Sequence, residues 1–311
     1  FVNELSSPAR LAHRNAVLEN VRAAANTYGR IFAIEYDVSG ATESTMASVI
    51  AADWQYLVET LDILNDPCYL YHDGKPVVIV WGLGLQGNPG TPAIATQIID
   101  FLKNYGGGQT LIGGVDRGCR TLTIGSKTDP AWASVYRSFD IITPWTVGAY
   151  RTTAEINSYR TNFIVPDMNE CNSLGIGYLP VVWPGFSWDN LMELPPGTSN
   201  FSRRNGSHLW DQVYSTKLAG ATMLFLAMFD EVDESTAIFK VSEVHPVTDH
   251  WVTYEGLPGD WYLRLAGAAQ RMLNGAIPLS STIPICPECG GDEVSFNLGE
   301  DVADRMTHIQ V

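Results

Sequence analysis

The sequence predicts an α/β fold, and specifically a (β/α)8 TIM barrel, from three observations. Strand-like runs alternate with helix-like runs, which is the pattern of βαβ crossovers and a parallel sheet. Seven such strands follow one another along the chain. The 311 residues are 45% hydrophobic, enough apolar material for one large core. We therefore predict one barrel domain over residues 1–276, and residues 277–311 form a C-terminal extension of unknown role.

Helix-period and strand-period runs alternate through the first half of the chain. The clearest helix is amphipathic, with Trp54 and Leu57 on its apolar face. A buried strand, PVVIVW, follows the dipeptide Asp73-Gly74, which is typical of a tight hairpin turn. Pro92 suits the first turn of the next helix. The elements predicted here are helices at residues 11–28, 46–64 and 92–105 and strands at residues 31–37, 69–72, 75–81 and 110–115.

The same alternation continues through the second half. A nearly all-apolar stretch at residues 219–229 is interpreted as a buried strand. Asp260 is predicted to cap the last helix. The elements predicted here are helices at residues 130–137, 153–174, 208–218 and 260–274 and strands at residues 141–145, 178–183, 219–229 and 250–254.

The hairpin arm at residues 69–72 is not a barrel strand, so the remaining seven strands leave the barrel one strand short. A barrel with a missing strand would expose hydrogen-bonding edges. Two explanations stay open: the sequence contains an eighth strand that the pattern does not reveal, or the first strand lies upstream of Phe1. In the second case residues 11–28 would form the first barrel helix.

Composition argues against several classes of function. The net charge is −15 and the 19 basic residues are scattered, which disfavours binding to nucleic acid or to an anionic membrane surface. No apolar run reaches the roughly 18 residues that span a bilayer, and no signal-peptide apolar region opens the chain. The six His show no metal-ligand spacing, and no phosphate-binding loop or serine-hydrolase elbow is present. We predict neither a metal nor a cofactor.

Cysteines and glycosylation sequons favour a secreted protein. Five Cys are an odd number, so at least one thiol is unpaired within the chain. Cys286 and Cys289 lack a second ligand pair nearby, so a disulfide, between them or to another cysteine, is favoured over zinc. Sequons at Asn200 and Asn205 lie in a polar loop. The prediction is a secreted glycoprotein with a disulfide.

An acidic cluster directly after the apolar stretch at residues 219–229 is a candidate active site. Its four carboxylates, Asp230, Glu231, Asp233 and Glu234, repel one another. Barrel active sites are built at the C-terminal ends of the strands. A solvated acidic loop is the alternative, and the position directly after a buried strand disfavours it.

Other predicted strand ends carry carboxylates and tryptophans, the side chains of a sugar site. Indole faces stack on sugar rings, and carboxylates bind hydroxyls and perform acid/base catalysis. Each has an alternative: a Trp there can be core packing, and Glu35 and Asp37 can form an ion network with Arg117. The candidate substrate-binding residues are Asp37, Glu35, Trp81, Arg117, Trp145, Tyr150, Trp183, Trp188 and Asp230.

Several segments resemble glycoside hydrolase family 99 and the related family 71/99-like proteins. They are MFDEVDESTAIFK at residues 228–240, PVVWPGFSWDNL at 180–191, ITPWTVGAY at 142–150, KPVVIVWGLG at 75–84 and LPGDWYLRLAG at 257–267. The resemblance spans most of residues 31–274. It implies a (β/α)8 barrel that acts within α-mannosidic chains with retention of configuration.

The resemblance also implies roles for two glutamates spaced Glu-x-x-Glu. Glu231 would act as a base on the substrate 2-hydroxyl to give a 1,2-anhydro sugar, and Glu234 would protonate the leaving oxygen and then activate water. Ser235 stands where related sequences commonly have Gly. The prediction is a glycoside hydrolase acting on an oligosaccharide or polysaccharide with α-linkages, and α-mannosides are one candidate. The alternative is a non-catalytic, lectin-like protein on a degenerate hydrolase barrel.

Overall fold

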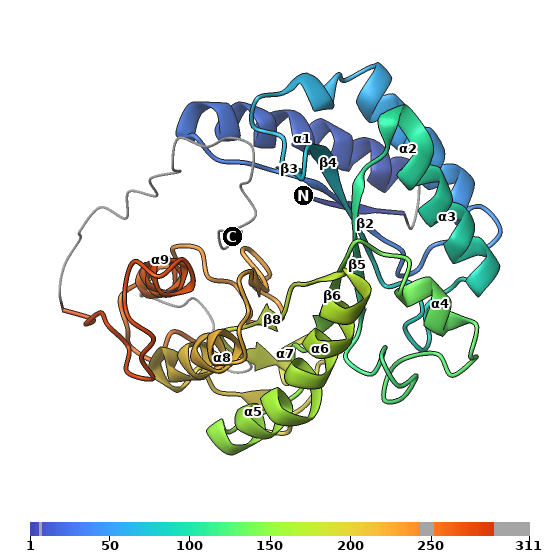
Figure 1. The fold of residues 1–311 in the computed structure, drawn as a ribbon. Helices are drawn as coiled ribbons and strands as arrows, with labels where there is room; N and C mark the ends of the chain where they lie inside the picture. The colour runs from blue at the N-terminus through green and yellow to red at the C-terminus, as the bar shows by residue number, and fades with distance from the viewer. Residues whose placement is uncertain (6–7, 243–251, 289–311) are drawn as a thin grey trace. The chain divides into compact units, whose positions relative to one another are not determined.

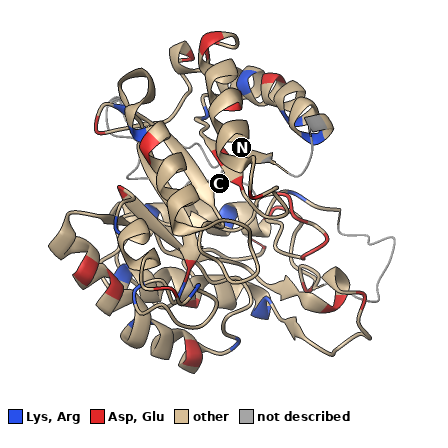
Figure 2. Cartoon of the chain, turned by 90° about the vertical axis from the view of Figure 1, so that its right-hand side faces the viewer, with Lys and Arg blue, Asp and Glu red and all other residues tan. Residues whose placement is uncertain are grey.

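A computed structural model describes residues 1–5, 8–242 and 252–288 (Figure 1). These residues form two compact units. Of the described residues, unit 1 contains those within 1–145 and 170–177, and unit 2 contains those within 146–169 and 178–288. Lys and Arg lie scattered over the helices and loops (Figure 2). Within the described ranges, no helix has the length and apolarity needed to cross a membrane.

A mostly parallel sheet forms the centre of unit 1. The Asp-Gly hairpin is confirmed: Asp73 (φ 50°) and Gly74 (φ 73°) take the left-handed conformations that such a turn requires. The strands, in sheet order, are β1 (Val2–Glu4), β2 (Ile34–Asp37), β4 (Lys75–Trp81), β5 (Thr110–Asp116), β6 (Ile141–Trp145) and β7 (Gly177–Tyr178), and β3 (Tyr71–His72) pairs with β4.

The strand missing from the sequence prediction is β1, which precedes the first helix. It pairs in parallel with β2, with Val2 opposite Glu35 and Asn3 opposite Tyr36. Of the two explanations left open, a strand that the sequence pattern did not reveal is therefore present, at residues 2–4. A three-residue strand is too short to show an alternating pattern.

Four helices of unit 1 were predicted and are confirmed: α1 (Pro8–Tyr28), α2 (Met46–Glu59), α3 (Pro92–Asn104) and α4 (Trp132–Tyr136). Figure 1 shows α1, α2 and α3 on the same side of the sheet. The predicted apolar face of α2 is buried, with Trp54 and Leu57 fully inaccessible. The Thr91 side chain caps α3 by accepting from the Ile94 amide, and Pro92 occupies the first turn.

Unit 2 is built around helices that cover short strands. The helices α8 (Ser207–Leu218) and α9 (Trp261–Leu273) pack on the parallel pair β8 (Val181–Val182) and β11 (Phe225–Leu226), with Trp210 and Trp261 in the shared core. A second pair, β9 (Phe186–Ser187) and β10 (Asn200–Phe201), is antiparallel and encloses α7 (Trp188–Leu191). The predicted helix at residues 153–174 is divided into α5 (Thr153–Tyr159), a π turn (Arg160–Ile164) and α6 (Val165–Leu174).

The predicted barrel is only partly confirmed: the fold is α/β with a mostly parallel sheet, and the described residues form no closed barrel. The predicted strand at residues 219–229 contributes only the two residues of β11. Residues 178–183 divide between β7 and β8, and residues 252–254 are not a strand. The other two residues of that predicted strand, His250 and Trp251, lie outside the described residues. Apolar runs predict burial, and here helix packing rather than strand pairing provides it.

Asp260 precedes α9 as predicted, but its side chain makes no capping hydrogen bond. Its carboxylate instead lies 3.9 Å from Arg264 Nη1, one turn into the helix. The segment after the predicted domain boundary packs on unit 2: Ile283 and Ile285 contact the core. The predicted disulfide of Cys286 with Cys289 involves a cysteine outside the described residues.

Candidate functional site

Two carboxylates project from one face of β2 at its C-terminal end. Glu35 and Asp37 alternate with the buried residues Ile34 and Tyr36, so the pleat places both carboxylates on the same face. Burial, with the like charge of Asp37 added, raises the pKa of Glu35 to about 7. Glu35 thus holds a proton to near neutral pH beside a second carboxyl group, that of Asp37.

Two tryptophans share that face of the sheet. Trp81 is opposite Asp37 in the β2–β4 register, and Gly114 is opposite Trp81 in the next strand pair. A Cβ on Gly114 would lie 2.3 Å from Trp81 Cδ1, so the glycine leaves room for the indole. The Trp81 ring meets Trp145 edge to face, with centroids 5.4 Å apart. The structure therefore brings together four predicted site residues of unit 1.

The fifth predicted residue of unit 1, Arg117, begins the loop after β5 and is half-buried. Its neighbour Asp116 shapes this loop: Oδ1 accepts from the amides of Gly118 (2.7 Å) and Gly125 (3.1 Å). The Asp116 carboxylate is therefore occupied by hydrogen bonds within this loop, and Arg117 belongs to the same turn.

In unit 2, the acidic loop (residues 228–240) follows β11. Its backbone folds onto itself: the amides of Thr236 and Ala237 donate to Glu231 O at 3.2 and 3.0 Å. Ser235 has φ 57°, the left-handed conformation that glycine adopts most readily. A glycine, which the resemblance leads one to expect here, would adopt this conformation without strain. The loop is thus a tight, defined turn between the two glutamates and the buried Ile238.

The acidic loop separates its carboxylates by exposure. Asp230 and Asp233 are exposed, whereas Glu231 and Glu234 are half-buried. Burial raises the pKa of Glu234, and the nearby charge of Asp233 raises it further. Glu234 therefore holds a proton to a higher pH than an ordinary glutamate, as a general acid must.

Two hydrogen bonds connect the acidic loop to the β9–β10 hairpin. The Ser187 amide donates to Glu234 O at 2.7 Å, and Asn190 Nδ2 donates to Asp233 O. Trp188, between these two residues, keeps 39% of its surface exposed and lies 6.0 Å from the Phe186 ring. The structure thus places Trp188 on the segment bound to the acidic loop.

Trp183 and Tyr150 lie in the interior of unit 2. Trp183 is fully buried and Tyr150 is 5% exposed. The Trp183 ring packs edge to face on His208, with centroids 4.4 Å apart, and Tyr150 OH donates to Gln212 Oε1 at 3.1 Å. Burial lowers the pKa of His208 to about 3, so its imidazole is neutral. The contact of these two rings with sugar stays a prediction, and the structure shows them as packing residues.

Three residues that support the site were not predicted from the sequence. They are Ser187 and Asn190, which hold the acidic loop, and Arg203, which donates to its backbone. The sequence signal for Asn190 is weak, since an Asn in a polar loop is ordinary. Arg203 lies between two sequons in a polar stretch, where a surface arginine is expected. In the ranges that the structure describes, no group of three or more His, Cys, Asp or Glu side chains is placed to hold a metal ion.

Comparison with known proteins shows a likeness of fold. No family model matches the sequence, and no curated protein matches it. A GH99 endo-α-mannosidase from Bacteroides thetaiotaomicron, in complex with bis-tris-propane, has a TM-score of 0.61 at 17% identity, over 84% of this chain and 74% of that chain. Another structure of a GH99 endo-α-mannosidase from that organism gives 0.58 at 18%, over 79% and 67%. A glycoside hydrolase-like protein gives 0.55 at 15%, over 85% and 80%. The chain therefore has a fold similar to that of GH99 glycoside hydrolases.

Proposed function

We propose that this chain is a glycoside hydrolase that cleaves α-linked glycans, with α-mannosides as the first substrates to test. Glu231 takes the proton of the substrate 2-hydroxyl while that oxygen attacks C1, and Glu234 gives its proton to the leaving oxygen as the glycosidic bond breaks. Water activated by Glu234 then opens the 1,2-anhydro sugar, so the configuration is retained. The roles follow from the resemblance of residues 228–240 to the Glu-x-x-Glu segment of family 99.

The environment of Glu234 is the observation that carries this proposal. The carboxyl is half-buried and has a raised pKa, which suits a group that must be protonated to donate to a leaving oxygen. Glu231 lies three residues earlier on the same hydrogen-bonded loop. A pair of carboxyl groups, one of them protonated, is the usual requirement of glycoside hydrolysis.

Unit 1 supports glycan binding independently. Trp81 and Trp145 are half-buried and in contact, on the same face as Glu35 and Asp37. An aromatic ring can stack on the apolar face of a sugar, while a neighbouring carboxylate accepts hydrogen bonds from the sugar hydroxyls. The other proposed substrate-binding residues are Arg117, Tyr150, Trp183, Trp188 and Asp230.

The test is a comparison of Glu231→Gln and Glu234→Gln with the unaltered chain on a panel of α-linked glycans that includes α-mannan. Released reducing ends measure cleavage, and NMR of the first product reports its anomeric configuration. We expect each variant to lose activity by about 1,000-fold or more, because each removes a proton-transfer group. Glu19→Gln, at an exposed position of α1, is the control. Full activity in either Glu231→Gln or Glu234→Gln would refute the assignment, and glycan binding without turnover in the unaltered chain would identify a carbohydrate-binding protein.

We also propose that the protein is secreted. Asn205 is exposed and lies in a left-handed turn, so a glycan there would project outward. Asn200 is half-buried and its Oδ1 accepts from Ser187 Oγ at 2.8 Å. Mass measurement of the chain after passage through a secretory pathway, before and after glycan removal, tests the proposal.

A further inference from the structure

We propose that Arg203 is a positioning residue for the proposed acid, because its guanidinium holds the acidic loop just after Glu234. The inference rests on the proposed function, in which Glu234 is the proton donor. Arg203 Nη2 donates to Ser235 O at 2.7 Å and to Ala237 O at 2.8 Å. The first carbonyl belongs to the left-handed residue Ser235, and the second lies two residues further along the chain.

The guanidinium is buried in an unusual way. Arg203 is 1% exposed, and among the described residues its guanidinium forms no ion pair with a carboxylate. Its carbon Cζ lies 4.7 Å from the centre of the Tyr254 ring and 4.5 Å from that of Tyr262. Burial lowers the pKa of Arg203. A buried cation is costly to the fold, and the contacts that it makes here are with aromatic rings and loop carbonyls.

A second side chain reinforces the same part of the loop. Tyr254 OH lies 3.2 Å from Ala237 O and 2.7 Å from Phe239 O, and it has one proton to donate between them. Ala237 O is thus approached by both Arg203 and Tyr254. The backbone from residue 235 to residue 239 is therefore held from the core side, and the side chains of Glu231 and Glu234 stay half-buried on the loop.

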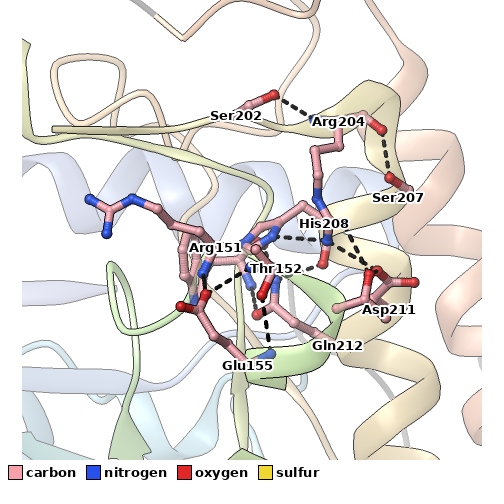
Figure 3. A network of polar contacts seen from close by, with 11 residues as sticks. Arg151, Thr152, Glu155, Ser202, Arg204, Ser207, His208, Asp211 and Gln212 are labelled. Carbon is pink, nitrogen blue, oxygen red and sulfur yellow. Dashed lines mark hydrogen bonds and ion pairs between the residues drawn. The ribbon is translucent and has the colours of Figure 1, made fainter. Parts of the chain in front are cut away.

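The start of the Arg203 side chain is fixed as well. A Cβ on Gly185 would lie 2.5 Å from Arg203 Cγ, so the glycine makes space for the arginine stem. On the other side, the neighbour Arg204 belongs to the polar network of Figure 3: its Nη2 pairs with Asp211 Oδ2 at 3.0 Å. Its amide donates to Ser202 Oγ at 3.0 Å. Arg203 thus reaches the acidic loop from a rigid base.

The first experiment measures the loop itself and needs no substrate. Hydrogen–deuterium exchange is compared between the unaltered chain and Arg203→Met, which keeps much of the apolar stem and removes the donors. We expect the amides of Ser235, Ala237 and Ile238 to exchange at least about 10-fold faster, because their hydrogen bonds form only while the loop is closed. Arg203→Lys should give an intermediate rate, since its ammonium cannot reproduce the planar fork of the guanidinium.

The matched control is Arg264→Met. Arg264 is also an arginine of unit 2 that donates to backbone carbonyls, with Nη2 at 2.7 Å from Cys286 O, and it lies over the Trp261 ring at 5.6 Å. Its loss should leave exchange in the acidic loop unchanged. Unchanged exchange in Arg203→Met, or equal acceleration in both variants, would overturn the inference. If Arg203→Met does not fold, Arg203→Lys and Gly185→Ala, which crowds the stem, decide the question in the same way.

The second experiment is kinetic. On α-mannan, Arg203→Met should lower kcat about 100-fold while KM changes less than about threefold, as for a misplaced catalytic group. The limb of the pH profile on which activity falls with rising pH should move to lower pH, because a loosened loop exposes Glu234 to water. Faster loop exchange with unchanged kcat and pH profile would overturn the positioning role. Full activity of Glu234→Gln would instead refute the proposed function, so the two failures are distinguishable.

Discussion

The Ser187 amide donates a hydrogen bond to the carbonyl oxygen of Glu234 at 2.7 Å. Because both partners are main-chain atoms, the bond survives any substitution of either side chain except one by proline at residue 187. It fixes the backbone of the proposed acid to the hairpin that carries Trp188. A proposed sugar-stacking ring and a proposed proton donor therefore belong to one hydrogen-bonded assembly within unit 2.

Asn190 provides the side-chain half of this connection, and its removal should loosen the acidic loop without detaching it. Asn190→Ala loses the Nδ2 donor to Asp233 O, while the Ser187 bond remains. We expect about 1 kcal/mol lower stability to urea and a kcat reduced about 10-fold on a cleaved glycan. Asn104→Ala is the control, since Asn104 is exposed at the end of α3 and its Nδ2 donates to Asp100 O at 2.7 Å. A variant with unaltered kcat would show that Asn190 does not position the loop.

Asp233 should set the pH at which activity falls. Its charge is one cause of the raised pKa of Glu234, after burial. A general acid works while protonated, so the rate declines as pH rises through that pKa. Asp233→Asn removes the like charge, lowers the pKa of Glu234 and should move the declining limb to lower pH. The profile of kcat/KM against pH measures this, with Glu19→Gln as the unshifted control. A shift to higher pH would contradict the electrostatic assignment.

The sequence predicted the arrangement of unit 1 better than that of unit 2, for physical reasons. Residues 75–81 bury a continuous apolar run in the sheet, so Trp81 at the end of the strand was expected there. The stretch at residues 219–229 is equally apolar but pairs over two residues only: Leu224 and Leu226 join the core under α8 and α9, whereas Phe229 stays 46% exposed. Arg203 could not be predicted, since a buried cation and a surface cation look alike in a polar stretch.

Gly114→Ala should displace the Trp81 indole. The new methyl would lie 2.3 Å from Trp81 Cδ1, so the ring must move away from its contact with Trp145. We expect a loss of roughly 1–3 kcal/mol in stability from overpacking, a changed near-ultraviolet circular dichroism signal and weaker glycan binding. Gly113→Ala is a matched control on the opposite face of β5, where the methyl would meet Phe139 at 2.3 Å. An identical spectral change in both variants would mean that the signal does not report the Trp81–Trp145 pair.

Glu35 should make the protein less stable as pH rises towards neutrality. Its pKa in the folded chain is raised by burial to about 7, above the ordinary value of 4.5. Between these two values the folded state binds more protons than the unfolded state, so the free energy of unfolding falls with rising pH. Glu35→Gln removes this contribution. Urea unfolding at several pH values from 4.5 to 7.5 should show a smaller decline in the variant than in the unaltered chain, and equal slopes would refute the raised pKa.

Asp53 should anchor β1 to the helices of unit 1. Its buried carboxylate accepts from Asn3 Nδ2 at 2.8 Å, Asn15 Nδ2 at 2.9 Å and Tyr36 OH at 2.8 Å, which lie on β1, α1 and β2. An amide in its place offers one acceptor oxygen, so Asp53→Asn would leave buried donors unpaired. We expect a loss of roughly 2–3 kcal/mol and faster hydrogen exchange at residues 2–4.

The matched control for the β1 anchor is Asp66→Asn. Asp66 is also a buried carboxylate with three donors: the Cys68 amide at 2.9 Å, and Arg22 Nε and Asn26 Nδ2, each at 3.0 Å, in the second half of α1. It should lower stability as well, because it loses comparable bonds, yet leave exchange at residues 2–4 close to that of the unaltered chain. If both substitutions accelerate exchange in β1 equally, the effect is general unfolding, and Asp53 has no special part in holding the first strand.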